Sequence, residues 1–332
     1  MNEPDIAVVI VTYRSAELAI ASLQSVQNER ALPGARIRVI VVDNASGDFA
    51  AIARAIEHND WSSWVTLLAA PRNGGFAYGN NLGIEHAYTA GAPDYIYLLN
   101  PDTQVRAGAI RSLIGFLETH PQVGIAGSSF ENLDGSDWPI AFRFPTLLSE
   151  LDAGLEWGLA TRLLAPWVVA RRMPAVTQRV DWVSGASMMV RGAVFALIGG
   201  LDENYFLYFE ETDFCRRASR AGFSTWYVPE SRVMHIAGQS TDVTDLTKNV
   251  RALPTYWFES RRRYFAVTFG LGYAMVTDIV AVLAHALGGL KRLLLGRRGH
   301  AIPHYLRDLV RHSVLWPRNR DLPARRSFSP RG

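Results

Sequence analysis

Short runs of β-branched residues, separated by stretches with helical spacing, constrain the fold of this chain most. Residues 6–11 (IAVVIV) form a continuous apolar run, and residues 37–42 (IRVIVV) form a second run that only Arg38 interrupts, as expected of strands that are buried on both faces. Residues 16–27 between them carry apolar side chains at helical spacing. Further strands are predicted at 65–68, 95–99, 123–127, 181–190 and 224–228, and further helices at 80–90, 107–119 and 211–221. Strands that alternate with helices predict βαβ units around a mainly parallel sheet.

Polar side chains follow three of these strands. Thr12 ends the first strand, Asp43 ends the second, and Asn100 and Asp102 follow the strand at 95–99. In parallel sheets, ligands bind at the carboxyl ends of the strands. The topology alone therefore predicts a binding site at this edge.

Two of these positions have alternative roles that the sequence leaves open. A carboxylate at Asp43 can accept a hydrogen bond from the imide N–H of a pyrimidine base, or it can form an Asx turn or helix cap in DNASGD. Asn100-Pro101-Asp102 can hold a hard divalent cation that bridges a diphosphate, and the same residues are strong turn formers.

A glycine-rich loop and a histidine are weaker indications. Residues 72–81 (RNGGFAYGNN) lead into the predicted helix at 80–90, with Asn80, Asn81 or the preceding glycine as its cap. The loop amides can approach a phosphate or ribose, but the loop has no Walker lysine and no dinucleotide fingerprint. His235 follows a predicted strand and is either a packed residue or a ligand for a cation such as Mn²⁺.

The stretch FLYFEETDFCRR, residues 206–217, places three carboxylates beside aromatic residues. Burial near aromatic rings and mutual repulsion raise the pKa of a carboxyl group, which makes it a better general base. An acidic helix start followed by arginines explains Asp213 equally well. It does not explain why Glu210 and Glu211 follow the aromatic residues directly.

The composition restricts the class and the compartment. The chain has 332 residues with a net charge of +3, so we expect no nucleic-acid partner. Its one cysteine, Cys215, cannot form an intrachain disulfide, which favours a reducing, cytoplasmic compartment. Residues 1–5 are polar and acidic, and we expect no signal peptide.

The C-terminal region is basic and partly apolar. Residues 264–290 are long enough to span a membrane and are flanked by Arg261–Arg263 and Lys291–Arg292, but Asp278 would be costly in hydrocarbon. The sequence leaves three interpretations: a membrane span, helices at the interface with phospholipid headgroups, or a buried helical hairpin broken at Gly288-Gly289.

Six motifs in order reveal a family resemblance. Over residues 5–245 the chain closely resembles the family 2 inverting glycosyltransferases, in particular their bacterial rhamnosyltransferase-like branch. Each motif alone is weak, whereas the ordered set is specific. The motifs are VVIVTYRS, VVDNASGD, PRNGGFAYGNNLGI, YLLNPDT, VSGASMMVRGAVFALIGGLDENYFLYFEETDFCRRASRAGF and HIAGQST.

The resemblance implies an α/β fold of the GT-A type, with a mostly parallel central sheet flanked by helices. We expect a glycosyltransferase domain at 1–245, divided into a nucleotide-sugar-binding half at 1–130 and an acceptor-binding and catalytic half at 131–245. Residues 135–180, without clear periodicity, form an excursion with short helices at 147–164. A helical, basic region at 246–320, for which peripheral contact with a membrane is one interpretation, and a disordered tail at 321–332 follow.

The resemblance also implies a nucleotide-sugar donor and a divalent metal, Mg²⁺ or Mn²⁺. The family's Asp-X-Asp motif reads Asn100-Pro101-Asp102 here, which leaves Asp102 as the main metal ligand, and His235 completes the site as in some relatives. The implied nucleotide-binding residues are Thr12, Arg14, Asp43, Asn73, Gly74, Asn100 and Asp102.

The implied catalytic base is Glu211, at a position where the family carries aspartate. Its extra methylene displaces the carboxylate by about one carbon–carbon bond, which matters for general base catalysis. Glu210 and Asp213 are expected to support it. Trp182, Ser184 and Gly185 match the strand that lines the acceptor pocket.

The expected activity is therefore the inverting transfer of a sugar, with dTDP-rhamnose as donor and a UDP-hexose or UDP-galactofuranose as alternative. The expected acceptor is a hydroxyl of a cell-surface glycan, or of a glycan on polyprenyl diphosphate, at the cytoplasmic face of the inner membrane. Two alternatives remain. A nucleotidyltransferase would require a basic glycine-rich loop after residue 11, which is absent. A catalytically inactive, glycosyltransferase-like scaffold subunit is the other.

Overall fold

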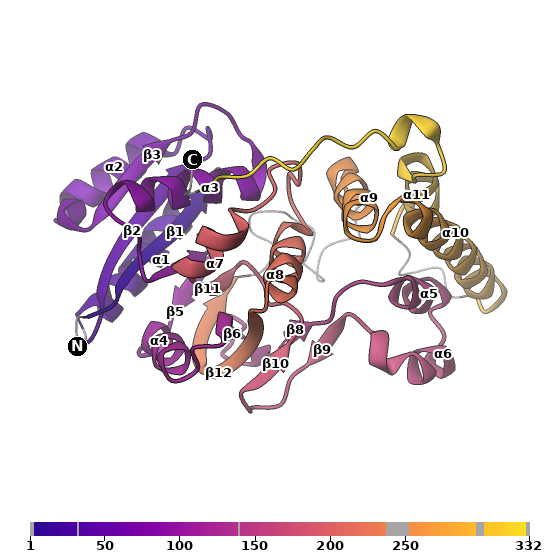
Figure 1. The fold of residues 1–332 in the computed structure, drawn as a ribbon, viewed down its shortest axis with the longest axis horizontal. Coiled ribbons are helices and arrows are strands. Elements are labelled where there is room, and N and C mark those ends of the chain that lie inside the picture. The colour runs from indigo at the N-terminus through magenta and orange to yellow at the C-terminus, as the bar shows by residue number, and fades with distance from the viewer. Residues whose placement is uncertain (1–2, 32, 139, 237–251, 297–301, 330–332) are drawn as a thin grey trace.

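A ten-stranded mixed sheet forms the centre of the protein in the computed structural model (Figure 1). The structure describes residues 3–31, 33–138, 140–236, 252–296 and 302–329. The main strand order is β10-β12-β6-β11-β4-β1-β2-β3, and β5 and β7 pair with β12 and β6. The strands are β1 (Asp5–Thr12), β2 (Arg36–Asp43), β3 (Val65–Ala69), β4 (Tyr95–Leu99), β5 (Thr103–Val105), β6 (Val123–Glu131), β7 (Asp137–Trp138), β10 (Gln178–Val180), β11 (Ser187–Arg191) and β12 (Ser224–His235).

The predicted α/β architecture is confirmed, although the sheet contains more antiparallel strand pairs than expected. β1, β2, β3 and β4 are parallel, whereas β11 runs antiparallel between β4 and β6. The chain reaches β11 from β6 through the irregular excursion, without the single crossover helix that joins parallel neighbours. β1 lies between β2 and β4, so the switch in strand order falls beside its carboxyl end.

Helices cover both faces of the sheet over two hydrophobic cores. The first core includes residues of α1 (Ala16–Arg30), α2 (Phe49–His58) and α4 (Ala109–Thr119). The second includes residues of α3 (Gly75–Thr89), α7 (Gly192–Ile198) and α8 (Glu210–Arg220). Apolar strand residues point alternately into the two cores, which explains the continuous apolar runs in the sequence.

Two predicted boundaries are wrong for identifiable reasons. The predicted helix at 80–90 begins at Gly75, so Asn80 and Asn81 lie inside α3 and do not cap it. The Asn81 side chain instead donates a hydrogen bond to the Leu201 carbonyl and accepts one from the Leu201 amide. The predicted strand at 181–190 starts only at Ser187, because Trp182 forms a separate bridge with Phe142.

The excursion after β6 carries a two-stranded sheet and two short helices. These are β8 (Ile140–Phe142), β9 (Ala170–Arg172), α5 (Leu147–Leu155) and α6 (Gly158–Leu163). The C-terminal region adds α9 (Thr255–Phe269), α10 (Leu271–Leu294) and α11 (Tyr305–His312), and the 3₁₀ helices are Trp61–Ser63, Ala165–Trp167 and Pro317–Asn319. Contacts of α10 with α5, α9 and α11 join these parts (Figure 1). The expected boundary at 245/246 lies outside the described residues.

The C-terminal helices form a hairpin, but its turn differs from the predicted one. The break between α9 and α10 is at Gly270, whose φ is 88°. Gly288 lies within α10, where a Cβ atom would come within 2.1 Å of the Gly154 carbonyl oxygen. A break at Gly288-Gly289 is therefore wrong: both glycines lie within α10, and Gly288 allows α5 to approach.

The buried Asp278 has a partner that the sequence did not indicate. Its carboxylate lies 2.6 Å from Arg261, which also pairs with Glu150 of α5, and it accepts a hydrogen bond from the Val314 amide. Within the described residues, α10 alone is long and apolar enough to cross a membrane, and 33% of its most apolar window is buried in the protein. Core helices of soluble proteins can have the same length and the same apolar character.

The segment that follows α11 crosses back to the sheet domain (Figure 1). Its carbonyl groups at Arg326 and Phe328 accept hydrogen bonds from the amides of Glu203 and Gly200, and the Phe328 ring packs on Tyr88 of α3. The prediction of a disordered tail at 321–332 is therefore wrong for residues 321–329. Composition did not reveal that this extended segment finds backbone and side-chain partners along its whole length.

Candidate active site

The loop after β1 and the loop after β2 are joined by carboxylate hydrogen bonds. Asp48 accepts hydrogen bonds from the Ser15 amide at 2.7 Å and from the Thr12 hydroxyl at 3.3 Å. Arg14 has a φ of 55° and its guanidinium lies over the Tyr13 ring. These contacts fix the edge of the sheet at the switch point, where a nucleotide is expected.

Asp43 forms the turn that the sequence offered as one of its two roles. Its carboxylate accepts hydrogen bonds from the amides of Ser46 and Phe49 and from the Ser46 hydroxyl, at 2.5–3.2 Å. A carboxylate has about four acceptor positions, so the turn leaves room for one further donor. The two roles of Asp43 are therefore compatible.

Asn44 joins the glycine-rich loop to β2, and sequence reasoning did not single it out. Its side-chain amide donates to Asn73 at 3.0 Å and to the Gly75 carbonyl at 3.1 Å, and its side-chain oxygen accepts from the Gly74 amide at 3.4 Å. Asn73 also accepts from the Gly75 amide. The position of Asn44, directly after Asp43 at a strand end, was the indication in the sequence.

A cavity of about 400 Å³ lies between these loops. Polar residues of its walls come from the loops after β1, β2, β3 and β4. Aromatic residues come from the loop before α8, which contributes Phe206, and from α9, which contributes Tyr256. The lining residues are Val11, Tyr13, Ser15, Asn44, Asn73, Gly75, Phe76, Asn100, Pro101, Phe206, Leu207 and Tyr256. Of the expected nucleotide-binding residues, Asn73 and Asn100 are among these lining residues, whereas Thr12, Arg14, Asp43, Gly74 and Asp102 are not.

Asp102 and His235 come together from different strands. The turn after β4 places Asp102, which is 3% exposed, and the end of β12 places His235 with its Nε2 atom 3.5 Å from an Asp102 carboxylate oxygen. His235 packs against Phe130 and Trp138, and its buried Nδ1 atom has no hydrogen-bond partner among the described residues. Asn100 lies in the same turn, which its carbonyl closes by accepting from the Thr103 amide.

This donor pair fits a divalent cation. A carboxylate and an imidazole suit Mn²⁺, and the remaining positions of such a site are filled by phosphate oxygens and water. Among the described residues there is no group of three or more His, Cys, Asp or Glu that could hold a metal. Asp102 and His235 would supply part of the coordination of a cation that also binds a diphosphate.

Glu210 and Glu211 begin α8 after a strained turn. Tyr208 and Phe209, both with φ near +70°, occupy the left-handed region that aromatic residues rarely adopt. Burial raises the pKa of Glu211 to about 7, although hydrogen bonds from the backbone, including the Gly185 amide, act in the opposite direction. Burial and the neighbouring Glu211 charge hold the pKa of Glu210 well above its usual range. The predicted rise in carboxyl pKa is confirmed.

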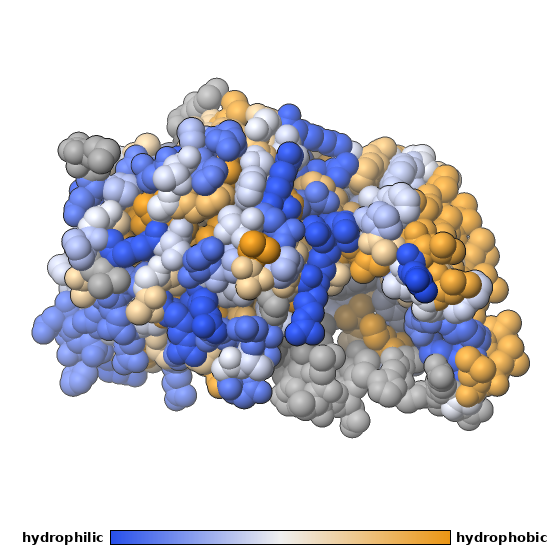
Figure 2. Space-filling view, turned by 90° about the horizontal axis from the view of Figure 1, so that it is seen from below, coloured by the Kyte–Doolittle hydropathy of each residue, from blue (hydrophilic) through white to orange (hydrophobic). Residues whose placement is uncertain are grey.

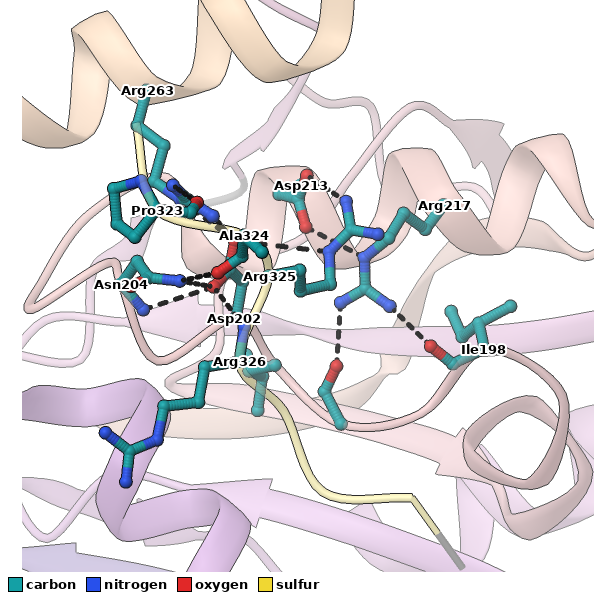
Figure 3. A network of polar contacts seen from close by, with 12 residues as sticks. Ile198, Asp202, Asn204, Asp213, Arg217, Arg263, Pro323, Ala324, Arg325 and Arg326 are labelled. Carbon is teal, nitrogen blue, oxygen red and sulfur yellow. Dashed lines mark hydrogen bonds and ion pairs between the residues drawn. The ribbon is translucent and has the colours of Figure 1, made fainter. Parts of the chain in front are cut away.

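Asp213 has a different environment from the two glutamates. It is 3% exposed and accepts a hydrogen bond from Arg217, one turn later in α8, at 2.8 Å. Arg325 from the C-terminal segment approaches its other oxygen at 3.6 Å (Figure 3). The acidic helix start proposed from the sequence therefore explains Asp213, which is compensated by two cations.

Of the three predicted acceptor residues, Gly185 lies next to Glu211. Trp182 stacks on Phe142 with ring centroids 4.1 Å apart. The Ser184 hydroxyl accepts a hydrogen bond from the Ala186 amide, which shapes the turn before β11. Gly185 is close to both Glu211 and Phe76, and an added Cβ atom would come within 2.9 Å of the Phe76 ring. The structure thus places Gly185 between Glu211 and the cavity wall.

Comparisons with known proteins identify the family of the chain. The sequence model of the family described as "Glycosyltransferase like family 2" matches residues 4–253. The N-acetylglucosaminyl-diphospho-decaprenol L-rhamnosyltransferase of Mycobacterium tuberculosis is 32% identical over 250 residues, 70% of this chain and 76% of the relative. The rhamnosyltransferase WbbL of Escherichia coli is 28% identical over 167 residues, 49% of this chain and 61% of the relative.

A solved structure supports the fold independently. The crystal structure of GalNAc-T7 with UDP, GalNAc and Mn²⁺ superimposes with a TM-score of 0.57 at 14% identity, covering 93% of this chain and 57% of that protein. At this identity the match concerns the fold alone, which is the GT-A fold expected from the sequence. The family match over most of the chain and the relative that is 32% identical lead to one conclusion: the chain is an enzyme that belongs to glycosyltransferase family 2.

Proposed function

We propose that this enzyme transfers rhamnose from dTDP-rhamnose to a hydroxyl of a polyprenyl-diphosphate-linked or cell-surface glycan, with inversion at the anomeric carbon. The observation that carries the proposal is Glu211, a carboxylate with a pKa of about 7 beside Gly185 and the wall of the nucleotide cavity. The names of the two relatives, both rhamnosyltransferases, support the sugar, and the first supports the lipid-linked acceptor.

The geometry supports a single displacement. Ionised Glu211 takes the proton of the acceptor hydroxyl while the hydroxyl oxygen forms its bond to the anomeric carbon. The bond between that carbon and the diphosphate breaks, and the nucleoside diphosphate leaves with the electron pair. A base with a pKa near the working pH is efficient because it is both ionised and basic enough to accept the proton. Burial and the charge of Glu211 hold the pKa of the neighbouring Glu210 well above its usual range.

Asp102 and His235 would hold a divalent cation, Mn²⁺ or Mg²⁺, at the diphosphate end of the cavity, with Asn100 beside them. When bound, the metal neutralises the charge that develops on the leaving diphosphate. The Thr12, Arg14, Asp43, Asn73 and Gly74 positions would contact the nucleotide. Trp182, Ser184 and Gly185 would contact the acceptor on the Glu211 side.

The face of α10 supports peripheral contact with the inner membrane at its cytoplasmic side. Exposed apolar side chains recur along one side of the helix, and Figure 2 shows that hydrophobic residues gather at the end of the molecule that carries α10. The exposed residues are Val276, Ile279, Leu283, Leu287, Leu290 and Leu294. Asp278, in contrast, points into the protein and pairs with Arg261, so it does not oppose such contact.

Asp43 does not determine which nucleobase the donor carries, because thymine and uracil share the imide N–H that would donate to its carboxylate. A UDP-hexose or UDP-galactofuranose is therefore the alternative donor.

The substitution Glu211→Gln tests the assignment of Glu211 as the general base. We expect this variant to bind dTDP-rhamnose with Mn²⁺ as tightly as the wild type does, by calorimetry, and to lose turnover by about 10³-fold.

A panel of dTDP- and UDP-sugars, measured by thermal shift with and without Mn²⁺, tests the donor. The true donor raises the melting temperature most, because it binds the folded state alone.

Unchanged turnover in Glu211→Gln would overturn the assignment of Glu211 as the general base. No binding of any nucleotide sugar by the wild type would overturn the proposed activity and favour the inactive scaffold.

A further inference from the structure

The C-terminal region completes the cavity that receives the donor. The family sequence model ends at residue 253, yet Tyr256 in the first turn of α9 lines the cavity together with Phe206 and Leu207. The residue that follows, Trp257, lines a different cavity and packs on Phe209 and Tyr305. Tyr256 is therefore the side chain that this helix contributes to the active-site wall.

The position of Tyr256 is held by neighbours on both sides. Its ring lies 5.2 Å from that of Phe206 and stacks on Tyr208 at 6.2 Å. One turn later in α9, the Ser260 hydroxyl donates to the Leu207 carbonyl at 3.0 Å. The Phe206 carbonyl in turn accepts from the Phe76 amide of α3 at 2.8 Å. These contacts connect α9, the 206–208 loop and α3 into one supported wall.

The lining of the cavity combines two kinds of side chain. Tyr13, Ser15, Asn44 and Asn73 provide polar groups from the loops assigned to the nucleotide, and Asn100 is two residues from Asp102 at the proposed diphosphate position. The remaining wall is mostly aromatic and aliphatic: Phe76, Phe206, Leu207 and Tyr256. Phe76 lies next to Gly185, which in turn lies next to Glu211, so a sugar whose anomeric carbon faces Glu211 would lie on the side of the cavity that this apolar wall forms.

We propose that Tyr256, with Phe206, determines the sugar specificity of the enzyme by packing against the apolar face and the methyl group of a 6-deoxyhexose. This inference rests on the proposed function and extends it to the choice of sugar. A hexose with a hydroxyl at C6 would lose water from that hydroxyl without gaining a partner on the aromatic rings. An apolar wall discriminates only moderately against an added hydroxyl, so we expect a preference of about 10-fold rather than exclusion.

The test compares dTDP-L-rhamnose with dTDP-L-mannose, which differ only in the hydroxyl at C6, and uses dTDP as the ligand without sugar. Calorimetry with Mn²⁺ is run on the wild type, Tyr256→Phe and Tyr256→Ala. We expect the wild type and Tyr256→Phe to prefer the deoxy sugar by about 10-fold. In Tyr256→Ala the preference falls towards unity, whereas the affinity for dTDP is unchanged because the polar side chains assigned to the nucleotide are untouched.

Two outcomes oppose the inference. An unchanged preference in Tyr256→Ala overturns it directly. An equal loss of affinity for dTDP and both sugars also overturns it, because that result assigns Tyr256 a general structural role. A wild type that binds UDP-sugars but not dTDP-sugars corrects the proposed donor only, and the same comparison is then made with UDP-L-rhamnose and UDP-L-mannose.

Discussion

Arg325 of the C-terminal segment lies 3.6 Å from Asp213, in the first turn of the helix that begins with Glu210 and Glu211. Figure 3 shows the network around this contact. Arg263 of α9 binds the buried Asp202 at 2.9 Å and the Pro323 carbonyl at 2.8 Å, and the Asn204 side chain donates to the Ala324 carbonyl. The segment thereby joins the C-terminal helices to the helix that carries the proposed base.

The first prediction concerns this junction. Arg325→Ala should lower the free energy of unfolding by about 1 kcal/mol, because Asp213 keeps Arg217 as a partner and Arg325 is partly exposed. Arg326→Ala is the matched control: its side chain is 73% exposed, and its contacts with Asp202 and Glu203 through the backbone survive the substitution. Chemical denaturation measures both. Equal effects of the two substitutions would show that the Arg325 side chain has no particular role.

The second prediction is a pH dependence of turnover. Because burial raises the pKa of Glu211 to about 7 in the free protein, the base is protonated in acid, and kcat/KM should rise through a midpoint near pH 7. Glu211→Asp should retain part of the activity, because it keeps a carboxylate at this position on a side chain that is one methylene shorter. A kcat/KM that is flat between pH 6 and pH 8 would contradict the assignment.

The third prediction links the same group to stability. A carboxyl whose pKa is higher in the folded state binds more protons there than in the unfolded state. Stability is therefore lost as the pH rises from the ordinary glutamate range towards pH 7. Glu211→Gln stays uncharged, so it should melt at a higher temperature than the wild type at pH 8. The difference should shrink towards pH 5, and a constant difference across this range would oppose the link.

Much of the fold could be predicted because its causes are local. Apolar runs such as 6–11 form strands that are buried on both faces, and polar residues at the strand ends, such as Thr12 and Asp43, come together at the switch point. The resemblance added what spacing cannot show, namely that Asp102 and His235, 133 residues apart, lie side by side.

The errors concern features that depend on distant partners. Nothing near Asp278 in the sequence indicates that Arg261 and the Val314 amide will compensate its charge. The composition of the last residues suggested disorder, because the partners of Arg325 and Phe328 lie in α8 and α3. Tyr256 was missed because the aromatic wall is assembled from two segments about 50 residues apart, and no local pattern marks it.

The fourth prediction tests membrane contact. Leu283→Asp combined with Leu287→Asp places two charges on the exposed face of α10, where both leucines are more than half exposed and little native packing is lost. We expect this variant to lose binding to vesicles that contain anionic phospholipid, in flotation assays, because inserting charges into the interface is unfavourable. Leu133→Asp is the control, since Leu133 is 65% exposed in a turn outside the C-terminal helices. Equal vesicle binding by the wild type and both variants would exclude this face as the contact.

The fifth prediction concerns the close contact between α3 and the loop before α8. Gly75 has a φ of +84°, and an added Cβ atom would come within 1.9 Å of the Phe206 carbonyl oxygen, which also accepts the hydrogen bond from the Phe76 amide. Gly75→Ala should therefore displace Phe206 from the cavity wall and destabilise the fold by about 3 kcal/mol or more, since both backbone strain and steric overlap result. Gly115→Ala is the matched control, because nothing lies within 4 Å of its added Cβ atom in α4 and alanine favours a helix by roughly 1 kcal/mol. Donor affinity and chemical denaturation should separate the two variants: Gly75→Ala loses both donor binding and stability, whereas Gly115→Ala keeps the former and gains slightly in the latter.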